Sequence, residues 1–314
     1  MNSDFAYRAV RMIGSLAVVA TLLAVLPFAV AEDKLADPIY RVANETPATQ
    51  PAVTAQSVAP AATPVAPAPA AAGGAAFDLT QKSGEHPLMP VIRTVKASQE
   101  IIDRDVRDYT CNLSKQERVD QVLGEKQTIL LKVMHQPFSV YMSFIQPFAG
   151  REVVYVAGQN NGDLVVLDVG FKRMLGKMNL DPNGTLAMKG QKHPITSVGI
   201  RNLTTKLNKM WEAETKFAEC EVTSKPDSKV AGRSATMIQV IHPVPRQDFK
   251  FYAARLFIDN ELKIPIHFDA YLWPDQAGGE APLEESYTYT NMKLNNNYTA
   301  RDFDSKNNPD IFKQ

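Results

Sequence analysis

From residue 108 onward the chain alternates apolar and polar residues with a period of two, and this alternation constrains the fold more than any other feature. The apolar positions of its first two runs are Tyr109, Cys111 and Leu113, then Ile129, Leu131 and Val133. Successive side chains of a β-strand point to opposite faces of the sheet. The alternation therefore predicts strands that place one face against a core.

Two asparagine–glycine turns predict hairpins between later strands. Asn160-Asn161-Gly162 lies between the apolar runs Val153–Val156 and Leu164–Leu167. An Asn-Gly pair between apolar runs is the strongest short-range signal for a hairpin, because both residues tolerate positive φ. Pro182-Asn183-Gly184 predicts a second hairpin. Its strands would be Met174–Asn179 and Thr185–Met188.

Further strands are expected in the second half of the chain, which gives about eleven in antiparallel order. They are Phe217–Thr223, Met237–Ile241, Phe251–Ile258, Ile264–Trp273 and Glu284–Leu294. Val153–Val156 and Leu164–Leu167 are apolar at every position, so both faces of these strands should be covered. We therefore predict a curved antiparallel sheet that forms an open half-barrel.

Two long helices are predicted to pack against the concave face of this sheet. Residues 88–107 place Leu88, Ile92, Val95 and Ile102 at the spacing of an amphipathic helix. A second apolar series follows His193-Pro194, where proline suits a helix start, and extends to Trp211. The fold class is therefore α+β.

The N-terminus has the pattern of a cleavable export signal. Arg8 and Arg11 precede the apolar run Met12–Phe28, which ends in Ala29-Val30-Ala31. A positive segment, an apolar segment and small residues before the cleavage point are typical of signal peptides. Residues 1–31 are therefore predicted to be removed before Glu32, leaving a soluble periplasmic or extracytoplasmic protein. The alternative is that this segment is not cleaved and anchors the chain in the membrane. We expect membrane contact only in that case.

Composition divides the rest of the chain at about residue 76. Residues 32–76 are rich in alanine and proline, which predicts a flexible linker. Residues 77–314 keep regular apolar patterning and are predicted to form a single domain. The formal net charge of zero, with both signs interspersed, disfavours nucleic-acid binding.

The only two cysteines of the chain, Cys111 and Cys220, are a candidate disulfide. Export into an oxidising compartment favours such a bridge, which would close a long loop. The alternative is two separate buried thiols, because sequence does not give the separation of the Cα atoms.

No pattern of catalytic or metal-binding residues stands out, so we expect neither an enzyme nor a cofactor. The five histidines are not at metal-ligand spacing, and His267 is expected to be structural. The oxygen-rich stretch Asp302–Asn308 does not follow the calcium-loop spacing and is better explained by Asx turns. There is no serine in a nucleophile elbow and no glycine-rich phosphate loop.

Glu285 and Arg255 are the two charged residues considered for ligand binding. Glu285 shares a strand face with Tyr287 and Tyr289, so it would either bind a polar head group in a cavity or form a cross-strand ion pair on a solvent face. Arg255 lies in an apolar strand and needs a partner. That partner would be Glu285, Asp269 or the anionic group of a ligand.

Four motifs together resemble a bacterial envelope family, domain of unknown function 1571. They are DYTCNL at 108–113, FAGREVVYV at 148–156, HPITSVG at 193–199 and LEESYTYTNMKLN at 283–295. The likeness covers roughly residues 87–312. By its order of strands and helices the chain is also similar to the lipoprotein-carrier (LolA/LolB-like) superfamily. That resemblance implies a half-barrel whose concave face holds helices and a cavity for acyl chains.

Two functions follow as hypotheses. The first is a non-enzymatic cell-envelope protein that binds a lipid or lipidated molecule in the half-barrel. Its apolar lining residues would be Phe138, Val140, Met142, Phe144, Leu164 and Val166, although the same residues would also suit an ordinary core. The second is an interaction or sensor module for an envelope protein partner, with a fully packed core.

Overall fold

The computed structural model describes residues 77–276 and 278–312. The predicted signal peptide at 1–31 and the linker at 32–76 lie outside these residues. None of the helices in the described ranges combines the length and apolar character that a membrane span requires.

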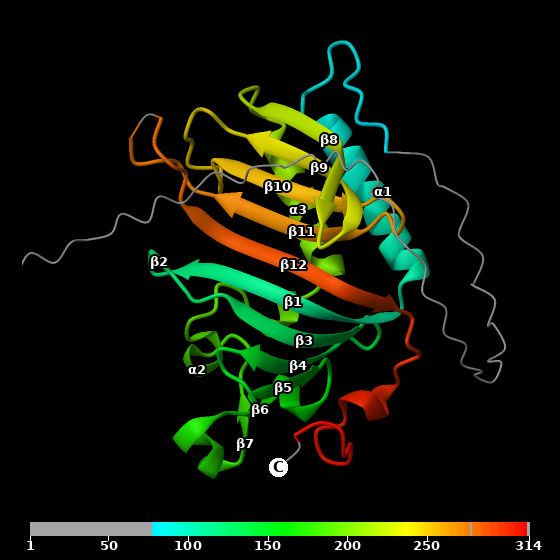
Figure 1. The fold of residues 1–314 in the computed structure, drawn as a ribbon, viewed down its shortest axis with the longest axis vertical. Helices are drawn as coiled ribbons and strands as arrows, with labels where there is room; N and C mark the ends of the chain where they lie inside the picture. The colour runs from blue at the N-terminus through cyan, green and yellow to red at the C-terminus, as the bar shows by residue number, and fades with distance from the viewer. Residues whose placement is uncertain (1–76, 277, 313–314) are drawn as a thin grey trace, which may run out of the picture. The chain divides into compact units, whose positions relative to one another are not determined.

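A single open antiparallel sheet forms the framework (Figure 1), as the sequence predicted. Its strands are β1 (Asp108–Val119), β2 (Val122–Leu123), β3 (Gln127–Met134), β4 (Ser139–Gln146), β5 (Glu152–Val156), β6 (Leu164–Leu167), β7 (Lys177–Leu180), β8 (Glu221–Val230), β9 (Arg233–Ile241), β10 (Ala253–Asp259), β11 (Pro265–Tyr271) and β12 (Leu283–Leu294). They are ordered β7-β6-β5-β4-β3-β1-β12-β11-β10-β9-β8, with β2 paired to β1. The two halves of the chain therefore meet where β1 pairs with β12.

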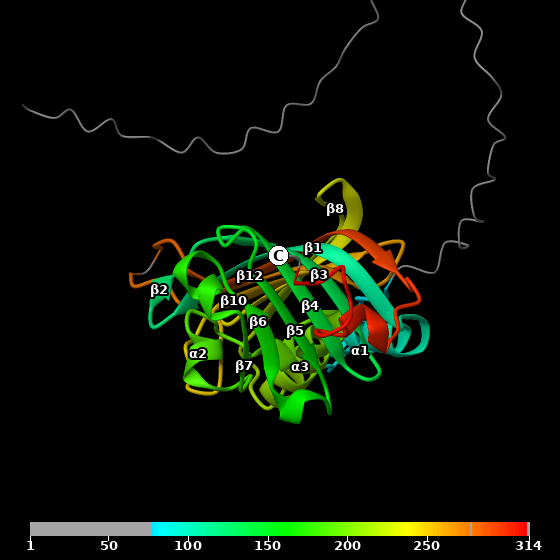
Figure 2. The ribbon, with the colours of Figure 1, turned by 90° about the horizontal axis from the view of Figure 1, so that it is seen from below.

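Two long helices lie on the concave face of this sheet (Figure 2). They are α1 (Met89–Asp105) and α3 (Ile200–Glu214). Each buries an apolar stripe, and Thr204 of α3 donates a hydrogen bond to the Gln99 side chain of α1 at 2.5 Å. The α+β half-barrel predicted from the sequence is confirmed.

Gly199 fixes the start of α3 against the sheet. Its φ is +106°, a region that L-residues rarely adopt, and a Cβ there would lie 2.8 Å from the Tyr109 hydroxyl. That hydroxyl oxygen accepts a hydrogen bond from the Ile200 N–H at 3.1 Å. The close approach of backbone and tyrosine therefore requires glycine at this position.

The convex face carries a second, smaller core over β4, β5 and β6. The C-terminal segment, including the short helix η4 (Ala300–Phe303), packs Phe303, Ile311 and Phe312 there. Glu152 accepts hydrogen bonds from the Tyr141 hydroxyl at 2.8 Å and from the Phe312 N–H at 2.7 Å. Both faces of β5 and β6 are therefore covered, which explains why residues 153–156 and 164–167 are apolar at every position.

The two asparagine–glycine turns have different outcomes. The first connects β5 to β6, which pair as an antiparallel hairpin. The second prediction is wrong, because β7 pairs with β6 and residues 185–188 form the short helix α2 (Thr185–Met188). The Met188 N–H donates to the Gly184 carbonyl at 2.9 Å, so this glycine begins a helical turn instead of a hairpin.

The candidate disulfide is also corrected by the structure. Cys111 and Cys220 are free cysteines, the first buried and the second half-buried. Cys111 lies on β1 and Cys220 directly precedes β8, with β12, β11, β10 and β9 between these two strands. The order of strands keeps the two thiols apart.

Candidate functional site

A cavity of about 710 Å³ lies between α3 and the concave face of the sheet. Its walls come from β1, β4, β12, the 193–199 segment, α3 and the segment before β10. The apolar lining comprises Leu113, Met142, Val198, Leu203, Met210 and Ala213, with the rings of Tyr287 and Tyr289. The lining residues Lys209, Lys216, Asp248 and Lys250 are exposed, so the cavity opens to solvent beside them.

Only one of the apolar residues predicted to line a cavity does so. Met142 of β4 faces it. The others pack into the concave core, and they are Phe138, Val140, Phe144, Leu164 and Val166. The same core contains residues of α1 and α3, so these side chains pack within it and do not line this cavity.

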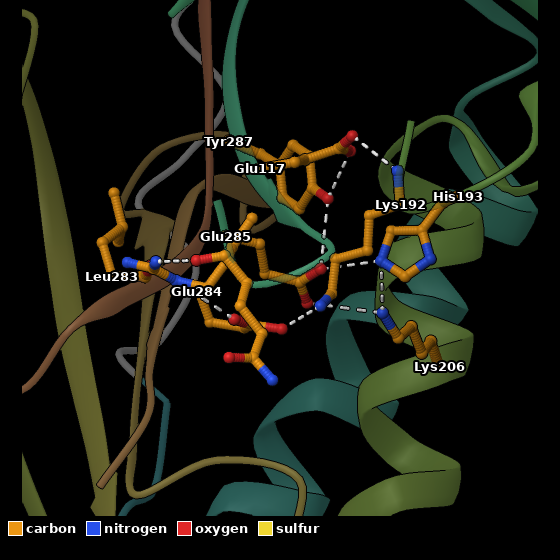
Figure 3. Close-up of polar contacts among 10 residues, drawn as sticks. Glu117, Lys192, His193, Lys206, Leu283, Glu284, Glu285 and Tyr287 are labelled. Carbon is orange, nitrogen blue, oxygen red and sulfur yellow. Dashed lines mark hydrogen bonds and ion pairs between the residues drawn. The ribbon is translucent and has the colours of Figure 1, made fainter. Parts of the chain in front are cut away.

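A buried carboxylate lies beside the cavity, where β12 meets the segment that precedes α3. Glu285 has no exposed surface. Its Oε2 lies 2.7 Å from His193 Nε2, and its Oε1 lies 3.4 Å from Lys206 Nζ. Figure 3 shows the histidine and the lysine converging on this carboxylate from the side of α3. These polar contacts thus join β12 of the sheet to α3 and to the segment that precedes it.

Tyr287 extends this network to a second buried carboxylate, Glu117 of β1 (Figure 3). The tyrosine hydroxyl donates to Glu117 Oε1 at 2.8 Å and lies 3.2 Å from Glu285 Oε2. Glu117 Oε2 accepts from the Lys192 N–H at 3.0 Å and pairs with Lys115 Nζ at 3.1 Å. Each carboxylate oxygen of this group, which we call the Glu285 network, therefore has a partner.

The partners decide the charge state of the Glu285 network. Burial alone would raise the pKa of the Glu285 carboxyl, but the hydrogen bond from His193 and the charge of Lys206 lower it to about 2. The pKa of Glu117 is likewise lowered, against its burial, by Lys115 and the Lys192 N–H. Burial and both carboxylates raise the pKa of the Tyr287 hydroxyl. The two carboxylates are therefore ionised near neutral pH, and the tyrosine hydroxyl keeps its proton.

These contacts decide between the alternatives for Glu285. The prediction that it shares a face with Tyr287 and Tyr289 is right, but that face is buried. The solvent-face alternative is wrong, and the ion-pair partner is Lys206, with His193 at hydrogen-bond distance, instead of an arginine.

Arg255 lies away from Glu285 and from the cavity. Its strand neighbours Ala254 and Leu256 belong to the concave core, so Arg255 points to the opposite face. It donates to the Gln239 side chain at 2.8 Å and lies over the Tyr271 ring at 5.0 Å. The structure therefore does not bring together the two charged residues considered for a ligand.

A third buried carboxylate, Glu214, lines the cavity at the C-terminal end of α3. It is 3% exposed, and its Oε2 has no hydrogen-bond partner among the described residues. His242, also 3% exposed, places Nε2 3.5 Å from that oxygen, and this nitrogen likewise lacks a partner. Burial raises the pKa of Glu214 to about 7, opposed by the charge of Lys250, and burial lowers the pKa of His242.

Other polar residues singled out in the sequence have structural partners. His267 contacts Thr288 at 2.8 Å and Asp269 at 3.0 Å. Asp304 accepts from the N–H groups of Lys306 and Asn307, as in an Asx turn. Across residues 77–276 and 278–312, no three or more His, Cys, Asp or Glu side chains are grouped to hold a metal ion.

Sequence reasoning missed most of the polar residues that surround the cavity. Glu117 lies in the charged run KQER, which resembles a solvated strand end. His193 and Lys206 belong to segments about 80 to 90 residues from Glu285. One signal was present for Glu214, because it follows Leu207 and Trp211 at positions i+7 and i+3 and so continues the apolar stripe of α3.

Comparison with known proteins gives one family match. The model of the family described as "Protein of unknown function (DUF1571)" matches residues 106–312. No curated protein sequence matches the chain.

Several solved structures are similar at low sequence identity. A putative outer membrane lipoprotein-sorting protein domain from Vibrio parahaemolyticus is 10% identical, with a TM-score of 0.31, over 67% of this chain and 97% of its own. The lipoprotein LppX of Mycobacterium tuberculosis is 14% identical, with a TM-score of 0.36, over 65% and 97%. A LolA superfamily protein from Nitrosomonas europaea is 10% identical, with a TM-score of 0.26, over 67% and 95%.

The TM-scores of these structures are below 0.5, so the structures do not bear on what this chain binds.

Proposed function

The chain belongs to the DUF1571 family, and from the cavity beneath its sheet we propose that it is a non-enzymatic, exported cell-envelope protein that binds a hydrophobic ligand. The ligand would be a lipid or a lipidated molecule held between α3 and the concave face. The signal pattern at residues 1–31 supports the extracytoplasmic location.

The single observation that supports this function is the cavity itself. Its volume of about 710 Å³ falls in the range of about 300–1,000 Å³ that is common for small-molecule sites. Small-molecule sites expose mostly apolar surface, and most of the surface that lines this cavity is apolar, although many of its residues are polar or charged. Protein cores are otherwise close-packed, so an apolar space of this size favours an occupant over an ordinary core.

Native mass spectrometry of the full chain, purified without detergent, tests this proposal. We expect a co-purifying lipid that is removed by organic extraction and restored by adding back the extract. A chain that carries no displaceable ligand and takes none up would contradict the proposal.

A matched pair of variants on α3 then locates the ligand. Met210→Trp places a large ring in the cavity and should reduce the bound fraction at least about tenfold, because the space is occupied. Glu212→Trp adds the same ring on the exposed side of the helix, where the Glu212 side chain is 47% exposed. This control should keep the ligand.

A second candidate function, an interaction module for an envelope protein, is favoured by the short helix η2 (Gly170–Leu175). Its side chains Phe171 and Met174 are each 80% exposed, and Leu175 is 64% exposed. Adjacent exposed apolar side chains are typical of contact surfaces. A photo-crosslinking residue at Phe171, compared with one at the exposed Glu261, would give a discrete adduct in the producing cell if this function is correct.

A further inference from the structure

The cavity has more lysines than its acidic residues can neutralise. Five lysines line it, at 115, 206, 209, 216 and 250. Lys115 pairs with Glu117, Lys206 with Glu285, and Lys216 with Asp248 at 3.3 Å. Lys209 and Lys250 form no ion pair or hydrogen bond with any residue that the structure describes.

These two lysines are placed at the mouth of the cavity. Lys209 lies on α3, three residues after Lys206 and one before Met210, all of which line the space. Lys250 lies three residues before β10 and also lines the cavity. Both are exposed, so their ammonium groups remain hydrated while their carbon stems border the apolar interior.

The buried acidic residue that lines the cavity near Lys250 does not neutralise these lysines permanently. Glu214 lines the same part of the cavity, and Lys250 is the charge that acts on it. His242 and Cys220 are its other titratable neighbours. Because burial raises the pKa of Glu214 to about 7, this carboxyl is mostly protonated in mildly acidic solution. A protonated carboxyl whose Oε2 is unpartnered can also donate a hydrogen bond to an anion.

Resting on the proposed hydrophobic-ligand function, we propose that the ligand is an anionic amphiphile whose carboxylate or phosphate head group binds Lys209 and Lys250 at the mouth of the cavity. Its chain extends inward over Met210, Leu203 and Met142. A cavity that has apolar side chains inside it, and two lysines without an ion pair among the described residues at its exposed edge, matches both halves of such a molecule.

The test compares probes that share one chain and differ in the head group. Dodecanoate, dodecyl phosphate and dodecanol are titrated into the full chain, and displacement of the neutral dye N-phenyl-1-naphthylamine is measured. We expect at least one of the two anions to bind about tenfold more tightly than the alcohol, because it forms two ion pairs that the alcohol cannot form. Whichever anion binds more tightly identifies the head group.

Lys209→Gln combined with Lys250→Gln should reduce the affinity for that anion to the level of the alcohol and leave alcohol binding unchanged. Lys126→Gln combined with Lys229→Gln removes two exposed lysines outside the cavity and should preserve the preference. Equal binding of anion and alcohol, or a preference that survives loss of Lys209 and Lys250, would overturn the head-group inference while leaving the hydrophobic-ligand function intact. Displacement by inorganic phosphate alone would also overturn it. Failure of all three chain probes, with no lipid in native mass spectrometry, would instead remove the proposed function.

Discussion

Two buried glutamates beside the same cavity are in opposite electrostatic conditions. Glu285 is held by His193 and Lys206, and the pKa of its carboxyl is about 2. Glu214 has an unpartnered oxygen and a pKa of about 7. The two regions are joined by α3, because Lys206 and Glu214 are eight residues, or about 12 Å, apart along its axis.

The difference separates a structural region from one that can accept a ligand. In the Glu285 network every carboxylate oxygen has a partner, so the network holds two segments together and has no free hydrogen-bond acceptor for another molecule. A buried group without a partner costs stability, and an incoming ligand can supply what is missing. The Glu285 network therefore stabilises the wall of the cavity, whereas the wall near Glu214 keeps a polar atom that a ligand can bind.

The largest expected effect is the loss of the charge at Glu285. Glu285→Gln should reduce the free energy of unfolding at pH 7 by about 3 kcal/mol, which corresponds to the difference between a pKa of 4.5 and one of about 2. Urea unfolding followed by tryptophan fluorescence measures it. Glu261→Gln, at a side chain that is 74% exposed, is the control and should change stability by less than about 0.5 kcal/mol.

The pH dependence checks the cause of that loss. Because the folded pKa of Glu285 lies below the unfolded value, its contribution is present above about pH 4.5 and disappears as the pH falls toward 2. The stabilities of the wild-type chain and Glu285→Gln should therefore converge in acid. A difference that stays constant from pH 7 to pH 3 would mean that packing, not charge, holds this region.

Glu214→Gln should have a smaller effect of the opposite sign. The folded pKa of Glu214 lies above its unfolded value, so the favourable contribution is complete below about pH 4.5 and is lost as the pH rises through 7. Relative to the wild-type chain, the variant should gain about 2 kcal/mol of stability between pH 5 and pH 8. Paired urea titrations at these two pH values measure this change.

Glu212→Gln is the matched control for Glu214→Gln, since it lies two residues away on the exposed side of α3. It should show no such difference between the two pH values. If Glu214→Gln became less stable relative to the wild-type chain on going from pH 5 to pH 8, Glu214 would be paired as an ion with His242, and the comparison with Glu285 would fail.

The sheet was predictable from sequence because local patterns determine it. Alternation from Tyr109 to Val133 marks the face toward the core, and the fully apolar runs of β5 and β6 correctly indicated that both faces are covered. The error at Gly184 has a local cause too. A glycine after asparagine allows a hairpin, but it also serves as the residue before a helix, and the sequence does not distinguish the two uses.

The polar site was much less predictable, because long-range pairing assembles it. Glu117 and Glu285 are opposite each other in the β1–β12 pair, where the first and second halves of the chain meet. No short-range pattern in their own segments identifies His193 and Lys206 as partners. The position of Glu214 in the apolar stripe of α3 predicts that this carboxyl is buried, but it does not predict which group the carboxyl faces.

The smallest expected effect compares two lysines of α3 that are three residues apart. Lys206→Gln should lower the free energy of unfolding by about 1 kcal/mol, because it removes the lysine that pairs with the buried Glu285 carboxylate, while the Lys206 side chain is itself 35% exposed. Lys209→Gln should change stability by less than about 0.5 kcal/mol, because Lys209 is exposed and has no ion pair among the described residues. Thermal and urea unfolding of the two single variants, side by side in low salt, measure the difference. Equal losses would show that Lys209 also stabilises the fold, and it could then no longer be regarded as a charge available to a ligand.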